Sequence, residues 1–338
     1  MSHYQWKYEN GVWTLEHIES KQQEFLSPPK TNNHWQKPLI FYILTWLSTT
    51  WIGSLMYGNS GQFWSGLWFS IPLMIILTFH ELGHYIQTRR YKVPSTLPFF
   101  IPVPLPPFGT MGAVIQMDSK IPNLRALFDI GISGPLAGLI PTLIFMFIGI
   151  GLSSLAVITP IEGGLVFGEP LLFRWVSMLF FDRSIPQTDL LLHPIAMAAW
   201  TGLFITSLNL FPIGQLDGGH IFYALLKRRA GLWSMILFGL ILLMVIFFGQ
   251  WQWSLMLILV MFFGIEHPPT CNDFVKLGRF RIILGYLTLA FVFIGFTPNP
   301  ISETKPDIQP KPVRKTIYSL NYQEENQPTP IFITFTKQ

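Results

Sequence analysis

The residues most able to do chemistry lie in the motif HELGH at positions 80–84, near the end of a long apolar stretch. On a helix, His80 and His84 are one turn apart and project from the same face, so two imidazoles can bind one metal ion. Glu81 lies beside them, where its carboxylate can take a proton from water. The alternative, two histidines hydrogen-bonded to backbone at a helix end, does not explain three costly polar groups in an apolar helix.

A second motif, NLFPIGQLDGGH at positions 209–220, offers a third ligand. Asp217 is the best candidate, because the prolines and glycines around it can break a helix and bring backbone close to a metal. Two imidazoles and one carboxylate suit one Zn²⁺ ion, with a fourth position open for a water molecule whose pKa falls toward ~7. Asp129 and His220 are weaker rivals, and Asp129 has the alternative of accepting hydrogen bonds at a helix start.

The composition favours a membrane as the solvent. Half of the residues are hydrophobic, only 12% are charged, and 30 phenylalanines outnumber the 18 acidic residues. A water-soluble domain carries about a quarter charged residues. The net charge of +4 is small and the basic residues are not clustered, so no nucleic-acid partner is expected. The single cysteine, Cys271, excludes an internal disulfide and a cysteine-based zinc site.

Apolar segments long enough, or nearly long enough, to cross a bilayer recur along the chain. They are 38–57, 64–87, 126–151, 194–212, 231–249, 251–265 and 282–297. The sequence therefore predicts an all-α polytopic membrane protein with about seven transmembrane helices. The proline-rich residues 93–117 cannot form a regular helix, so a re-entrant or short β segment should follow the zinc-binding helix.

The distribution of positive charge predicts the orientation and the division of the chain. If the N-terminus is cytoplasmic, the inner loops hold 11 Lys and Arg residues and the outer loops hold two. The second and fourth spans then both run inward, which brings the two motifs to the same depth near the cytoplasmic face. We expect three parts: a cytoplasmic N-terminal tail (1–37), a membrane-embedded domain (38–300) and a flexible C-terminal tail (301–338). We expect the protein to lie in the cytoplasmic membrane of a bacterium.

Taken together, HELGH and the segment 209–218 resemble the site-2 protease family of intramembrane zinc metalloproteases. The segments 98–114 (PFFIPVPLPPFGTMGAV), 128–138 (FDIGISGPLAG) and 267–270 (HPPT) are similar to the branch found in many bacteria and in plant chloroplasts. The resemblance covers roughly residues 38–300. It implies a zinc metalloendopeptidase that cuts transmembrane proteins in the lipid bilayer, in regulated intramembrane proteolysis or in clearance of membrane peptides.

The resemblance also implies a role for each site residue. His80, His84 and Asp217 would be the zinc ligands, and Glu81 the catalytic base. Asn209 matches an asparagine that handles the substrate or the oxyanion, although a hydrogen bond between helices is an equal alternative.

The segment 112–117 could form an extended strand beside the site, with Gly112, Ala113 and Val114 binding an unwound substrate through backbone hydrogen bonds. Alternatively, and equally compatible with the sequence, the segment is a re-entrant loop that shields zinc from lipid.

Two other classes of function remain as alternatives. A multi-span metal transporter would need further polar ligands along several spans, whereas these candidates converge at one depth. A catalytically silent membrane scaffold that retains the protease fold would be expected to lack one of His80, Glu81, His84 or Asp217, and all four are present.

Overall fold

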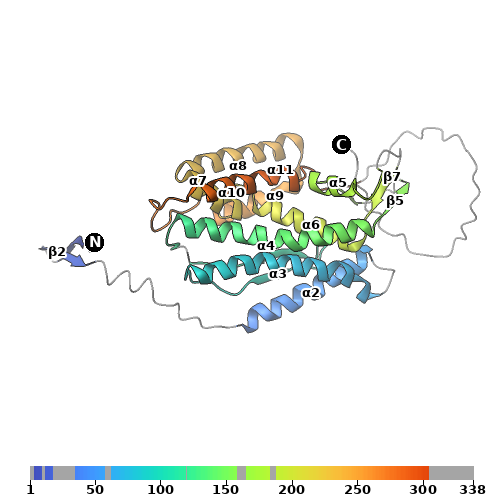
Figure 1. The fold of residues 1–338 in the computed structure, drawn as a ribbon, viewed down its shortest axis with the longest axis horizontal. Coiled ribbons are helices and arrows are strands. Elements are labelled where there is room, and N and C mark those ends of the chain that lie inside the picture. The colour runs from blue at the N-terminus through green and yellow to red at the C-terminus, as the bar shows by residue number, and fades with distance from the viewer. Residues whose placement is uncertain are drawn as a thin grey trace, which may run out of the picture.

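The structure, a computed structural model, describes residues 4–9, 12–17, 35–57, 62–118, 120–157, 165–182 and 188–303. Long helices run side by side through most of this part of the chain (Figure 1). Those long and apolar enough to cross a membrane are Gln36–Met56, Phe63–Arg90, Leu124–Gly151 and Arg229–Phe248. These helices support the predicted polytopic membrane protein, although the described part of the chain is mainly rather than entirely helical, since it also holds four pairs of strands.

The predicted number of seven spans is not confirmed. The segment 194–212 forms helix α6 (Pro194–Asn209) of 16 residues, which at 1.5 Å per residue is about 24 Å long and shorter than the ~30 Å hydrocarbon core. In the segment 251–265 the 3-10 helix η2 (Trp251–Trp253) is followed by only ten residues of α-helix, α9 (Ser254–Phe263), which ends at Gly264 with a positive φ of 101°. The last segment is divided between α10 (Arg279–Ala290) and α11 (Val292–Gly295).

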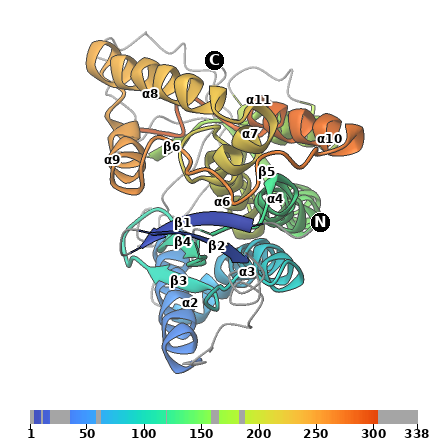
Figure 2. The ribbon, with the colours of Figure 1, turned by 90° about the vertical axis from the view of Figure 1, so that its left-hand side faces the viewer.

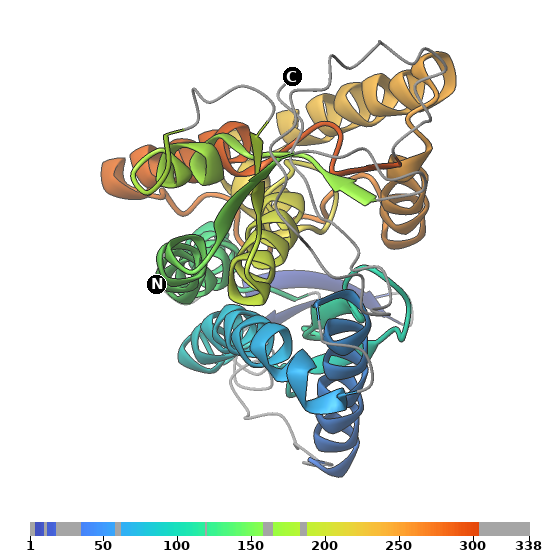
Figure 3. The same cartoon turned by 90° about the vertical axis from the view of Figure 1, so that its right-hand side faces the viewer.

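Helix α4 (Leu124–Gly151) lies at the centre and packs against α3 (Leu67–Arg90), α6 and α7 (Asp217–Leu226). Figures 2 and 3 show α4 and α6 between α2 (Gln36–Tyr57) and α3 on one side and the helices from α7 onward on the other. The Asn123 side chain caps α4 by accepting hydrogen bonds from the backbone of its first turn. The largest buried side chains include Phe69, Phe128 and Trp200.

The outer surface of the helices is apolar. Phe247 and Phe248 near the end of α8 (Arg229–Phe248) are 74% and 75% exposed. Tryptophans such as Trp51, Trp64 and Trp68 are also exposed. A surface this rich in exposed apolar side chains would be unfavourable in water and is matched by lipid.

A short antiparallel pair of strands follows α3. Strand β3 (Phe99–Pro102) pairs with β4 (Thr110–Val114), with Phe99 opposite Val114. The predicted strand 112–117 therefore begins two residues earlier and ends at Val114, although a single bridge joins Ser95 to Met117. A re-entrant segment is not confirmed.

Smaller elements complete the described part of the chain. They are β1 (Tyr4–Glu9), β2 (Val12–His17), η1 (Phe63–Gly66), β5 (Ser154–Val157), β6 (Leu165–Phe167), α5 (Leu171–Ser177), β7 (Thr188–Leu191), η2 (Trp251–Trp253) and β8 (Ile301–Glu303). The antiparallel pairs are β1 with β2, β5 with β7, and β6 with β8. Strand β8 lies in the predicted C-terminal tail; residues 304–338 and most of the N-terminal tail fall outside the described residues.

Candidate metal centre

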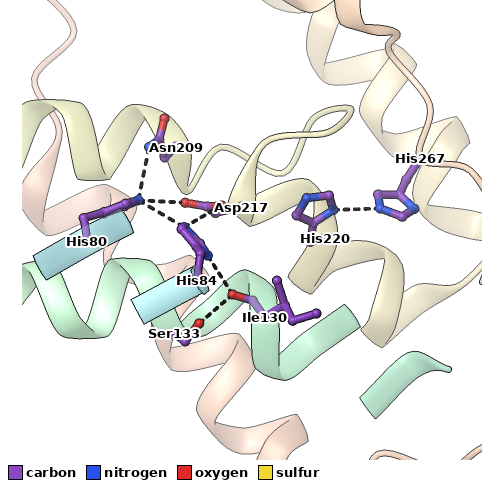
Figure 4. Close-up of polar contacts among 8 residues, drawn as sticks. All are labelled: His80, His84, Ile130, Ser133, Asn209, Asp217, His220 and His267. Atoms are coloured by element: carbon purple, nitrogen blue, oxygen red, sulfur yellow. Dashed lines mark hydrogen bonds and ion pairs between the residues drawn. The ribbon is translucent and has the colours of Figure 1, made fainter. Parts of the chain in front are cut away.

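Three side chains from two distant segments meet in the interior (Figure 4). His80 and His84 project from α3, and Asp217 is the first residue of α7. His80 Nε2 lies 3.2 Å from Asp217 Oδ2, and His84 Nε2 lies 3.2 Å from Asp217 Oδ1. The two histidine Nε2 atoms are 3.3 Å apart. The structure thus brings the three predicted ligands together across a sequence separation of 137 residues.

The turn between α6 and α7 carries Asp217 to this position. Helix α6 ends at Asn209, and α7 begins at Asp217, so the predicted helix break lies between them. Gly214 in this turn has a φ of +58°, a left-handed conformation that glycine adopts without strain. A Cβ at Gly218 would lie 2.0 Å from the carbonyl oxygen of Leu210, so only glycine lets α7 start this close to the end of α6.

Helix α4 orients the His84 ring. His84 Nδ1 donates a hydrogen bond to the Ile130 carbonyl at 2.8 Å, and the Ser133 hydroxyl donates to the same oxygen at 2.8 Å. With its proton on Nδ1, the neutral ring turns the lone pair of Nε2 toward Asp217. A Cβ at Gly134 would lie 2.0 Å from His84 Nε2, so this glycine makes room for the ring.

This supporting role of α4 was not predicted. Its signal was present in the segment 128–138, where Gly131, Gly134 and Gly138 are three and four residues apart and share one helix face. A Cβ at Gly138 would lie 3.0 Å from His80 Cβ, so Gly134 and Gly138 pack against the histidines of α3, whereas a Cβ at Gly131 would lie 2.8 Å from His220 Cβ on α7.

Glu81 is buried at the same level of α3, with 5% of its surface exposed. Its carboxylate is close enough to His80, His84 and Asp217 for electrostatic interaction. Within the described residues, no group forms a hydrogen bond or ion pair with this carboxylate. Glu81 is therefore placed beside the three clustered side chains without being held by another protein group.

Asn209 also lies at the cluster. Its side-chain Nδ2 is 3.4 Å from His80 Nε2, a contact that joins the end of α6 to α3. Strand β4 lies beside α6, one turn before Asn209. A Cβ at Gly112 of β4 would be 4.0 Å from Cγ2 of Ile205 on α6. Val114 is 44% exposed, and among the described strands β4 pairs only with β3.

The two rival ligands lie outside the cluster. Asp129 accepts two hydrogen bonds from Arg281, at 2.7 and 2.8 Å, and one from the Tyr91 hydroxyl. It therefore joins α4 to α10 and to the end of α3, and the alternative of a helix-start acceptor is wrong because Asn123 fills that role. His220 forms its hydrogen bond with His267.

The donor set fits one zinc ion. Ligands about 2.0–2.1 Å from a tetrahedral ion are about 3.3 Å apart. The two Nε2 atoms are 3.3 Å apart, and each lies 3.2 Å from one carboxylate oxygen of Asp217, Oδ2 for His80 and Oδ1 for His84. Asp217 makes its ion pairs with these two histidines, and no lysine or arginine of the described chain pairs with it. Neutral imidazoles leave this carboxylate uncompensated, and a divalent cation supplies the missing charge.

Comparison with known proteins also supports a zinc site. A sequence model described as peptidase family M50 matches residues 68–246. The chain is 29% identical over 237 residues to "Probable zinc metalloprotease EGY1, chloroplastic" of Oryza sativa subsp. japonica, covering 67% of this chain and 39% of that protein. It is 30% identical over 165 residues to "Probable zinc metalloprotease EGY2, chloroplastic" of Arabidopsis thaliana, covering 48% and 29%. The chain spans about two fifths of the length of the EGY1 protein, and no solved structure matches significantly.

Proposed function

The chain belongs to peptidase family M50, the site-2 protease family, and we propose that it is a zinc metalloendopeptidase that cuts membrane proteins within or near the bilayer. The observation that carries this proposal is the convergence of His80, His84 and Asp217, with Glu81 beside them, inside an apolar helical protein. Nε2 of each histidine and a carboxylate oxygen of Asp217 would hold one ion. Bound zinc would supply a Lewis acid and lower the pKa of a water molecule toward ~7.

Glu81 is the proposed catalytic base. Its carboxylate takes a proton from the water as the water oxygen bonds to the substrate carbonyl carbon, and it passes that proton to the amine when the C–N bond breaks. A carboxylate that no described protein group holds is free to accept the water proton. Asn209, at the end of α6 and against His80, is the proposed contact for the substrate carbonyl as charge develops on its oxygen.

A glutamine at position 81 separates binding from chemistry. Glu81→Gln keeps the shape of the side chain but cannot accept a proton, so the variant should retain zinc and lose hydrolysis. Purified wild type and variant are compared for zinc content by mass spectrometry and for cleavage of a transmembrane substrate. A Glu81→Gln protein that cleaves at the wild-type rate would remove Glu81 from the mechanism.

The substrate must be unwound before attack, because a peptide bond in a helix is shielded by its own hydrogen bonds. We assign this role to β4, where Gly112, Ala113 and Val114 would pair with an extended substrate segment. The position of Gly112 near Ile205, one turn from Asn209, supports the proposal. In the alternative, β3 and β4 only cover the site and separate it from lipid. Changes in β4 would then have no effect on the binding of the substrate backbone.

We place the membrane domain at 38–300 and the site near the cytoplasmic face, in the cytoplasmic membrane of a bacterium. The excess of Lys and Arg in the loops on the side of the two motifs supports this orientation. The named relatives are chloroplastic plant proteins, and that location is a property of those proteins.

A substrate can be found by comparing cells that carry Glu81→Gln with cells that carry the wild type. The proposal predicts uncut membrane proteins that accumulate only with the variant. Altered metal uptake without any accumulated protein would favour the transporter alternative. In the described residues, however, the His, Cys, Asp and Glu side chains that could share an ion form one group of three, which supports a single centre over a path across the membrane.

A further inference from the structure

The loop after α9 docks on the helix that carries Asp217. His267 Nε2 lies 2.7 Å from His220 Nδ1, one turn along α7 from Asp217 (Figure 4). The His267 ring also packs against the rings of His220 and Tyr223, each with its centroid 4.8 Å away. His267 is therefore held by two successive turns of α7.

The direction of the His220–His267 hydrogen bond follows from the second contact of His267. Its Nδ1 lies 2.6 Å from the Pro268 carbonyl, which can only accept, so Nδ1 carries the proton. The Nε2 of a neutral His267 then accepts, and His220 Nδ1 donates. His220 is buried, so loss of this acceptor would leave a polar N–H without a partner.

The loop is itself fixed at other points. The Tyr223 hydroxyl donates to Asp273 Oδ2 at 2.7 Å, and the Thr270 hydroxyl donates to Asp273 Oδ1 at 2.6 Å. The Cys271 N–H donates to the Ile121 carbonyl, just before α4. The loop thus connects α7 to the segment that leads into α4, the helix that orients His84.

The position of α7 matters because Asp217 lies at its start. Side-chain atoms lie about 5–6 Å from a helix axis, so a rotation of roughly 10° moves a carboxylate by about 1 Å. Metal–ligand distances tolerate only about 0.2 Å. We propose that His267 is a positioning residue for the metal centre: by accepting from His220, it fixes the rotation of α7 that aims Asp217 at His80 and His84. This inference rests on the proposed ligand role of Asp217.

Two conservative variants of His267 differ in reach. In His267→Gln the side-chain oxygen lies near the position of Nε2 and can still accept from His220, whereas in His267→Asn it is one methylene too short. Zinc affinity of the purified full-length chain is measured by competition with a chelator. We expect His267→Asn to weaken zinc binding by about tenfold, the lower end of the range for supporting contacts, and His267→Gln to stay within about twofold of the wild type.

Two further measurements separate positioning from general loss of structure. The absorption spectrum of the cobalt-substituted protein reports ligand geometry, and it should change in His267→Asn and return in His267→Gln. His193→Ala is the matched control, since His193 caps the other end of α6 and should leave both zinc affinity and spectrum unchanged.

The outcomes distinguish this inference from the proposed function. If the wild type binds zinc and His267→Asn binds it equally with the same cobalt spectrum, the positioning role is overturned and the metalloprotease proposal stands. If His267→Gln weakens binding as much as His267→Asn, the hydrogen bond to His220 is not the cause and the inference also fails. If the wild type binds no zinc, the proposed function fails first.

Discussion

The substitution Gly134→Ala tests how closely α4 supports the metal centre. The added Cβ would lie 2.0 Å from His84 Nε2, whereas an ordinary contact needs about 3.5 Å, so the ring or the helix must move by roughly 1.5 Å. That movement is several times the tolerance of a metal–ligand bond. We therefore expect zinc affinity to fall by more than about 100-fold, beyond the loss that follows removal of a supporting contact.

Zinc affinity of purified Gly134→Ala, measured by chelator competition, is compared with two other glycine variants. Gly138→Ala should have a smaller effect, because its Cβ would lie 3.0 Å from His80 Cβ. Gly239→Ala on α8 is the matched control: nothing lies within 4 Å of its Cβ, and zinc affinity should change by less than about twofold. Gly134→Ala protein with wild-type zinc affinity would refute the arrangement of α3 and α4 described above.

Three further changes test other parts of the structure. Gly112→Pro should impair substrate cleavage and leave zinc content intact, because proline cannot adopt the φ of +91° at this position and would distort β4. Unchanged cleavage would reject the strand role. Asp129→Asn should lower the free energy of unfolding by about 1–2 kcal/mol with zinc content unchanged, since it weakens hydrogen bonds from Arg281, which is 35% exposed. Burial alone would raise the pKa of Asp273, but hydrogen bonds, the Thr270 hydroxyl first among them, lower it below its usual value. The ionised Asp273 carboxylate stabilises the fold above its unfolded pKa of about 3.9, and this contribution is lost as the pH falls through its folded pKa. The free energy of unfolding of the wild type should therefore fall more between pH 6 and pH 3 than that of Asp273→Asn. Equal losses would contradict this reasoning.

The histidine pair could be predicted because it depends only on local geometry. Two residues four apart on a helix share a face whatever surrounds them, so His80 and His84 follow from their spacing. The choice of Asp217 needed the order and direction of the spans as well, and the structure places its carboxylate 3.2 Å from both rings. The number of spans, which is not confirmed, does not affect this, since α3 and the end of α6 are present.

The predicted number of spans is not confirmed, because hydropathy alone does not locate helix ends. The apolar segment 251–265 reads as continuous, yet a 3-10 turn occupies Trp251–Trp253 and Gly264 ends α9 with a positive φ. The sequence also does not predict which residues far apart in the chain form hydrogen-bonded pairs. Asp129 and Arg281 are 152 residues apart, and nothing in the local pattern around either residue identifies its partner.

The interaction of His220 with His267 shows the same limit. The sequence identifies His220 only as a rival ligand, and the HPPT segment only as a mark of one branch of the family. Their contact became visible once the loop was placed on α7, because it joins positions 47 residues apart.

The central claim is that three side chains hold one zinc ion, and diffraction from crystals of the purified protein at the zinc absorption edge tests it most directly. We predict one anomalous peak per chain, about 2.0–2.2 Å from Nε2 of His80, Nε2 of His84 and a carboxylate oxygen of Asp217. A protein free of zinc would contradict the claim, and so would an anomalous peak beside His220 and His267 with no peak beside Asp217.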